Sequence, residues 1–255
     1  MLETRGLTIR FGGHVAVNAV SCAFAPGTLT AIVGPNGAGK TTYFNLISGQ
    51  LKASAGTVSL NGRDLSGLSP SARTHAGLGR AFQLTNLFPN LTVLENVRLA
   101  VQATRAGAHR HGLNLWSNRS DHKALTERAE QILADVALEP RAHATVASLP
   151  HGDQRKLEVA LLMALDPRVF MFDEPTAGMS VDEVPVVLDL IRKLKQDKSK
   201  TILLVEHKMD VVRELADRII VLHNGTLVAD GEPAEVIASP VVQEAYLGVV
   251  KEPQP

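Results

Sequence analysis

The 255-residue chain lacks net charge, because 26 lysine and arginine residues are balanced by 26 aspartate and glutamate residues. This balance argues against a protein that binds nucleic acid mainly by neutralising phosphates. A single cysteine, Cys22, excludes an intramolecular disulfide and is expected to be a small buried residue. No apolar run approaches the roughly 20 residues of a membrane-spanning helix, and the N-terminus lacks a signal-peptide pattern. We therefore expect a cytoplasmic protein that does not itself span a membrane.

Apolar residues make up 45% of the chain, which is enough for a substantial core. Residues 28–33 are expected to form an apolar strand, and the short apolar runs at 169–172 and 201–205 are typical of strands buried on both faces of a parallel sheet. Helical patterns lie between them, so the fold class is α/β. Asn-Gly pairs at 61–62 and 224–225 each predict a tight hairpin.

The middle of the chain has a different character, since no strand signal appears between residues 84 and 149. Thr92 and Glu95 have the spacing of a helix capping box, and apolar faces with helical periodicity follow. We predict one domain over 1–255, with a core of 1–83 and 155–240, an inserted helical subdomain of 84–154 and a C-terminal tail of 241–255. Residues 104–123 are expected to form a solvated loop.

A complete phosphate-binding loop follows the first apolar strand, in the sequence Gly34-Pro35-Asn36-Gly37-Ala38-Gly39-Lys40-Thr41. Its backbone N–H groups and the next helix N-terminus favour an anion, while Lys40 supplies a charge for the outer phosphates and Thr41 a hydroxyl for Mg²⁺. This motif predicts a P-loop NTPase core, yet kinases, GTPases and many ATPases share it. The residues expected to bind the nucleotide here are Gly34, Asn36, Gly37, Ala38, Gly39, Lys40, Thr41 and Thr42.

Two adjacent carboxylates end the apolar run at 169–172. Asp173 can hold Mg²⁺ through water, and Glu174 can act as the general base that polarises an attacking water. Such a pair is by itself often only a strand that meets solvent, so the neighbouring motifs decide its meaning.

Taken together, these motifs resemble those of the ATP-binding subunits of ABC transporters, over essentially the whole chain. Gln83 in 80–83 stands at the Q-loop glutamine, 149–154 at the signature motif, 173–179 at the acidic strand with the D-loop, and His207 at the switch histidine. The resemblance implies the ABC ATPase fold, with an N-terminal antiparallel β subdomain, and it implies ATP and Mg²⁺ as cofactors. It implies Glu174, His207, Gln83 and Lys40 as catalytic residues, Thr41, Gln83 and Asp173 as metal ligands, and Phe11 and Gly152 as further nucleotide contacts.

The signature departs from the family pattern, because Pro150-His151-Gly152 stands where Ser-Gly-Gly is usual. Proline offers neither a hydroxyl nor a backbone N–H, so the N–H of Gly152 and the following helix N-terminus remain for the phosphate. His151 either supplies a replacement donor or points to solvent.

Details around 82–97, 150–160, 205–212 and 242–248 are similar to subunits of branched-chain amino acid importers and urea importers. This resemblance implies a peripheral subunit on the cytoplasmic face of the inner membrane. It implies transmembrane permease subunits, a second ATP-binding subunit in a homo- or heterodimer and, indirectly, a periplasmic solute-binding protein, with no nucleic acid. Phe88, in the apolar segment 84–91, is expected to contact the permease, although burial in its own subdomain is the alternative.

Two other functions remain open at this point. A lipopolysaccharide-export ATPase subunit has similar motifs, and a soluble ABC ATPase that serves DNA repair, cluster assembly or translation is a different class. The chain has a single cassette and lacks a basic arm and metal-binding cysteines, which argues against the soluble class.

Overall fold

A computed structural model of the chain describes residues 1–81, 87–108, 119–240 and 242–243. The N-terminal part is an antiparallel sheet with strand order β2-β1-β4-β5. Its strands are β1 (Leu2–Phe11), β2 (His14–Phe24), β4 (Ala55–Leu60) and β5 (Arg63–Asp64). The predicted turn between β4 and β5 is confirmed, since Asn61 and Gly62 take the positive φ values of 51° and 78° that this hairpin needs.

The second sheet is mainly parallel and has the strand order β10-β9-β3-β8-β7-β6. Its strands are β3 (Leu29–Val33), β6 (Leu78–Ala81), β7 (Val169–Asp173), β8 (Thr201–Val205), β9 (Arg218–His223) and β10 (Thr226–Gly231). Only β10 is antiparallel to its neighbour, because the Asn224-Gly225 turn folds it back on β9. The three predicted apolar runs are β3, β7 and β8, and they lie next to one another in the order β3-β8-β7. The expected α/β class is confirmed.

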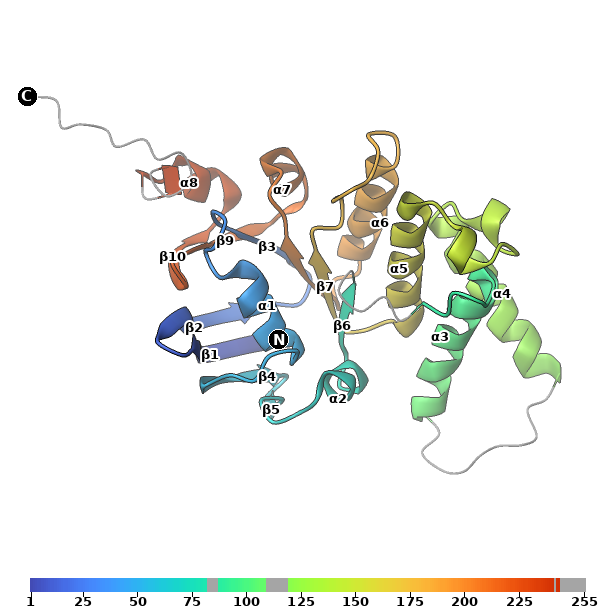
Figure 1. Cartoon of the computed structure of the whole chain (residues 1–255), viewed down its shortest axis with the longest axis horizontal. Coiled ribbons are helices and arrows are strands. Elements are labelled where there is room, and N and C mark those ends of the chain that lie inside the picture. The colour runs from blue at the N-terminus through green and yellow to red at the C-terminus, as the bar shows by residue number, and fades with distance from the viewer. Residues whose placement is uncertain (82–86, 109–118, 241, 244–255) are drawn as a thin grey trace, which may run out of the picture.

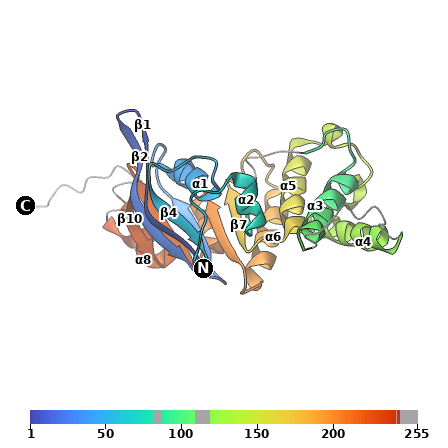
Figure 2. The ribbon, with the colours of Figure 1, turned by 90° about the horizontal axis from the view of Figure 1, so that it is seen from below.

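The phosphate-loop helix α1 (Lys40–Ser48) packs between the two sheets. Its Tyr43, Phe44 and Ile47 are fully buried in a cluster that includes Phe24 of the first sheet and Ile32 of the second. Cys22 is buried in the same cluster, as predicted. Figures 1 and 2 show α1 beside the first sheet, far from the helical end of the molecule.

That end contains α3 (Val93–Ala108), α4 (Arg119–Asp135), the short 3₁₀ turns Glu139–Arg141 and Val146–Ser148, and the first part of α5 (His151–Leu165). The predicted capping box starts α3, with the Thr92 N–H donating to Glu95 Oε2 at 2.8 Å and the Glu95 N–H donating to Thr92 Oγ1 at 3.2 Å. The expected loop at 104–123 is wrong at both ends, because α3 continues to residue 108 and α4 begins at 119. Apolar periodicity marks only the part of a helix that carries an apolar face, so it does not fix where the helix begins or ends.

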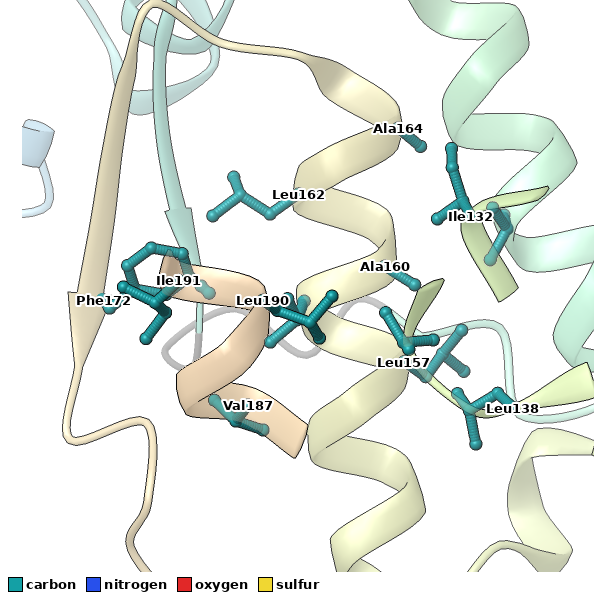
Figure 3. Packing of buried hydrophobic residues seen from close by; sticks show 14 of the residues in the cluster. Ile132, Leu138, Leu157, Ala160, Leu162, Ala164, Phe172, Val187, Leu190 and Ile191 are labelled. Carbon is teal, nitrogen blue, oxygen red and sulfur yellow. The ribbon is translucent and has the colours of Figure 1, made fainter. Parts of the chain in front are cut away.

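Helix α5 connects this helical end to the second sheet. Figure 3 shows Leu157 and Ala160 directed towards Ile132 and Leu138, while Leu162 points the other way, towards the side of Phe172. All six belong to one buried cluster. The division of the chain at residues 84 and 154 stays a prediction.

The remaining helices are α2 (Pro70–His75), α6 (Val184–Gln196), α7 (Met209–Leu215) and α8 (Pro233–Ala238). Helix α6 packs its buried Val187, Leu190 and Ile191 in the cluster of Figure 3. Within the described ranges, no helix combines the length and the apolar character that crossing a bilayer requires.

Candidate active site

The loop between β3 and α1 has the backbone shape that its glycines predict. Gly34 has a φ of 152°, and a Cβ there would lie 2.2 Å from the carbonyl oxygen of Leu222. Gly39 caps α1 with a φ of 95°, and a Cβ there would lie 2.5 Å from the carbonyl oxygen of Ala16. Both distances are well inside van der Waals contact with backbone that cannot rotate away, so glycine is required at both positions.

A hairpin from the other end of the chain supports this loop from behind. The Gly225 N–H, at the turn between β9 and β10, donates to the Ala38 carbonyl at 3.0 Å. The Gly225 carbonyl accepts from the Asn18 N–H of β2 at 2.8 Å. The loop is therefore fixed by both sheets and not only by the strand and helix that flank it.

Lys40 points back into the loop that precedes it. Its ammonium group donates to the carbonyls of Gly34 at 2.7 Å and Pro35 at 2.9 Å, and the residue is buried. Burial lowers the pKa of Lys40, and the nearby charges of Glu174 and Asp173 oppose that change. A cation is thus held inside the anion-binding loop, with two carboxylates close by.

Asp173 ends β7 and is held by an arginine that the sequence analysis did not identify. Arg80 of β6 donates from Nη2 to Asp173 Oδ2 at 2.6 Å, and from Nη1 to Asn45 Oδ1 at 2.6 Å and Ser48 Oγ at 3.0 Å. Its guanidinium carbon lies 4.9 Å from the centroid of the Phe44 ring. Burial lowers the pKa of Arg80, opposed by Asp173. One carboxylate oxygen of Asp173 is therefore fixed from the α1 side.

Glu174 and His207 come together at the carboxyl ends of β7 and β8. Glu174 has a left-handed backbone with a φ of 50°, and its N–H donates to the Val205 carbonyl at 2.9 Å. Its Oε1 lies 2.7 Å from His207 Nε2, and each side chain is about 40% exposed. A non-glycine residue in this conformation costs roughly 1–3 kcal/mol, which the surrounding structure has to offset. The strain places the carboxylate in reach of the histidine and of solvent.

These groups border a pocket of about 450 Å³. It brings together most of the predicted nucleotide and catalytic residues, namely Phe11, Asn36, Gly37, Ala38, Gly39, Lys40, Thr41, Thr42, Glu174 and His207. Phe11 is 50% exposed at this pocket. His14 and Ala16, at the start of β2, also line it and were not predicted. The one signal for His14 is its place in the hairpin that begins after Phe11.

Some predicted residues are not part of this pocket. Gly34 is at the start of the loop and packs against the backbone of Leu222 in β9, and Asp173 accepts a hydrogen bond from Arg80. Gly152 is in the first turn of α5 and does not line the pocket, and α5 lies on the opposite side of β7 from α1 in both views (Figures 1 and 2). Gln83 lies outside the described residues. One copy of the chain thus does not bring its phosphate loop and its signature turn to the same pocket.

The signature turn has an acidic neighbour that the sequence analysis did not identify. A Cβ on Gly152 would lie 1.9 Å from Glu183 Oε1, so that carboxylate is packed against the turn. Glu183 Oε2 accepts from the N–H and the hydroxyl of Ser180, and these bonds lower the pKa of Glu183. His151 lies beside Gly178, where an added Cβ would be 3.2 Å from its Nε2. From the sequence, we expect His151 either to donate to phosphate or to point to solvent. In the structure its ring also lies against the loop after β7.

The side chains at the pocket could bind Mg²⁺ only together with oxygen atoms of a bound phosphate ligand. Within the described residues, no group of three or more His, Cys, Asp or Glu side chains could hold a metal by itself. Thr41 and Asp173 offer a hydroxyl and a carboxylate oxygen, which are hard ligands of the kind that Mg²⁺ takes alongside phosphate.

Comparisons with known proteins agree with this geometry. A family model described as "ABC transporter" matches residues 17–177. A second model, "Branched-chain amino acid ATP-binding cassette transporter", matches residues 226–252.

Curated relatives match almost from end to end. The chain is 39% identical to the high-affinity branched-chain amino acid transport ATP-binding protein LivG of Salmonella typhimurium, over 97% of this chain and 98% of the relative. It is 37% identical to the corresponding BraF protein of Pseudomonas aeruginosa, with the same coverage. Among solved structures, an ABC transporter ATP-binding cassette in its ADP conformation is similar with a TM-score of 0.79 and 28% identity, over 98% of this chain and 99% of that one. A dimeric cassette bound to ADP and Pi is similar with a TM-score of 0.76 and 26% identity, over 91% of this chain and 99% of that one.

Proposed function

Because this chain belongs to the ABC transporter family and is one of its ATP-hydrolysing subunits, we propose that it powers the import of branched-chain amino acids across a bacterial inner membrane. The observation that carries the substrate class is the match over almost the whole chain to LivG and BraF, together with the C-terminal match to the branched-chain family model. The chain itself does not contact the cargo in this proposal, since it supplies only the ATP-driven motion.

In the proposed mechanism, ATP binds in the pocket with its adenine on Phe11, whose exposed face suits base stacking. Lys40 exchanges its two loop carbonyls for β- and γ-phosphate oxygens, while the loop N–H groups bind the phosphates around it. Thr41, Gln83 and Asp173 would hold Mg²⁺, which would neutralise phosphate charge there. Asp173 keeps one oxygen available for this role because Arg80 binds only Oδ2.

Glu174 is the proposed general base, which accepts the proton of the attacking water at its carboxylate. His207, 2.7 Å from Oε1 of Glu174, orients that carboxylate and contacts the γ-phosphate. The strained backbone of Glu174 supports this assignment, because such conformations gather at functional sites.

A second ATP-binding subunit completes the site in this proposal. Gly152 of one copy does not line the pocket of its own phosphate loop, so the N-terminus of α5 is available to the ATP of a twofold partner. ATP then favours the closed pair by contacting both subunits, and hydrolysis removes those contacts.

The hydrolytic part of the proposal is tested with Glu174→Gln. This variant should lower kcat by on the order of hundreds-fold and accumulate ATP-bound dimers in size-exclusion chromatography. The wild-type rate per chain should rise with protein concentration. Rapid turnover by the variant, or a rate independent of concentration, would refute the base or the pair respectively.

Permease subunits bind, we propose, at the segment that contains Phe88. Phe88 is 55% exposed, and the buried Asn96 fixes its backbone by accepting from its N–H at 2.9 Å and donating to its carbonyl at 3.2 Å. An exposed apolar ring on a backbone fixed in this way suits a partner surface. This contact places the subunit at the cytoplasmic face of the inner membrane and leaves the periplasmic solute-binding protein an indirect partner.

Phe88→Cys crosslinking to a co-expressed permease tests this surface, with Leu99→Cys, on the same helical end, as the control position. Crosslinks from Phe88→Cys alone support the proposal, and equal or absent crosslinks contradict it. The cargo is tested in the host by deleting the gene. Leucine uptake should be lost, then restored by the wild-type chain and not by Glu174→Gln, while uptake of an unrelated sugar is unchanged.

A further inference from the structure

A buried carboxylate, Glu206, lies directly before His207 at the end of β8 and has no part in the mechanism above. The residue is only 3% exposed. No lysine or arginine in the described part of the chain forms an ion pair with it. Hydrogen bonds satisfy it instead, because Oε2 accepts from the N–H of His207 at 2.7 Å and from the N–H of Lys208 at 3.3 Å.

The other oxygen of Glu206 reaches across to the neighbouring loop. Thr176, two residues after Glu174, donates its hydroxyl to Glu206 Oε1 at 2.5 Å, and Thr176 is 1% exposed. A short bond to a charged acceptor is stronger than one between neutral groups. Because both groups are shielded from water, neither can exchange this bond for a solvent contact without the loops moving apart.

Two cross-contacts therefore join the loops after β7 and β8. The strands themselves are paired in parallel up to Asp173 and Val205. Beyond them, one contact is at the pocket, between Glu174 and His207, and the other is buried, between Thr176 and Glu206. The buried contact fixes the backbone N–H of His207 on one side and the chain that carries Glu174 on the other.

We infer that Thr176 and Glu206 are positioning residues, which set the separation between the carboxylate of Glu174 and the ring of His207. This inference rests on the roles proposed above for Glu174 and His207. A misplacement of about 1 Å in a reacting group can lower a rate by about 100-fold, so the loss of this bond should appear in catalysis before it appears in nucleotide binding. In the part of the chain that the structure describes, no hydrogen bond joins Thr176 or Glu206 to the phosphate loop, to which we assign most of the nucleotide contacts.

The test uses the full chain and compares Thr176→Val with Thr176→Ser. Valine keeps the shape of threonine and removes the hydroxyl, whereas serine keeps the hydroxyl. Thr176→Val should lower kcat for ATP by about 10- to 100-fold with KM changed by less than about 3-fold, and Thr176→Ser should restore most of kcat.

Thr4→Val is the matched control. Thr4 of β1 is also buried, and its hydroxyl lies 2.7 Å from the hydroxyl of Tyr43 in α1; neither residue lines the pocket. This variant should lower the melting temperature about as much as Thr176→Val does and leave kcat unchanged. A merely structural role for Thr176 predicts equal effects of the two valine variants on kcat.

Glu174→Gln and His207→Ala are measured in the same assay to separate the two levels of the argument. Full activity of Thr176→Val beside an inactive Glu174→Gln would overturn this inference alone. Full activity of both Glu174→Gln and His207→Ala would overturn the proposed roles and this inference with them.

Discussion

Replacing Arg80 with methionine removes the buried connection between α1 and Asp173. The three hydrogen bonds of Arg80 to Asp173, Asn45 and Ser48 are lost, and the side chains of the ion pair are only 6% and 12% exposed. Methionine still fills the space above the Phe44 ring, so little cavity is created. The dominant cost is the charge of Asp173 left buried without its partner, and such breaks cost about 3–5 kcal/mol.

Urea unfolding followed by circular dichroism measures this loss. Arg80→Lys should lose less, about 1–3 kcal/mol, because it keeps the charge but cannot reach all three acceptors. In an Asp173→Asn background the cost of Arg80→Met should fall by at least about 1 kcal/mol, as expected of coupled partners. The control is Arg5→Met, which breaks an ion pair with Glu3 whose arginine side chain is 77% exposed, and which should change stability by less than about 1 kcal/mol. If Arg80→Met is as mild as this control, or if its cost is unchanged by Asp173→Asn, the ion pair does not hold Asp173 as described.

Three further outcomes are expected. Phe11→Ala should weaken ATP binding by about 5- to 150-fold in a fluorescence titration, since stacking on one base contributes about 1–3 kcal/mol. The melting temperature should stay unchanged because the ring is half exposed, and unchanged affinity would remove Phe11 from the site. Gly39→Ala should abolish nucleotide binding and destabilise the fold by at least about 1–3 kcal/mol, because its Cβ would meet the Ala16 carbonyl at 2.5 Å. If this variant binds nucleotide as well as the wild type does, the loop can relax. Burial raises the pKa of the Cys22 thiol, so the native chain at pH 8 should react with a thiol reagent far more slowly than the chain in urea, and equal rates would contradict the burial.

Local sequence signals predicted much of the fold, because their physical causes are local. A short run of mainly apolar residues is favoured by burial on both faces of a sheet, and the three such runs are the central strands β3, β8 and β7. The Asn-Gly pairs at 61–62 and 224–225 identify hairpins because both residues must take positive φ. The phosphate loop could also be identified from the sequence, because its backbone conformation requires glycine at particular positions.

The site residues that could not be identified from the sequence act through partners that are mostly distant in the chain. Arg80 is 35 residues from Asn45 and 93 from Asp173, and nothing in its neighbourhood on β6 indicates either one. Thr176 and Glu206 are 30 residues apart, and their contact depends on β7 and β8 being neighbours in the sheet. The hydrogen bonds of Glu183 join it only to Ser180, three residues earlier, so nothing in its neighbourhood in the sequence indicates that its carboxylate packs against Gly152 at the start of α5.

The bond between Gly225 and the carbonyl of Ala38 means that the last quarter of the chain is not dispensable for recognising the nucleotide. A fragment that stops after β8 retains every residue of the glycine motif, yet it loses the hairpin tip on which that motif rests. Truncation at this point would leave a recognisable motif in a protein unable to maintain its shape, so the smallest unit that can bind ATP extends at least through β10.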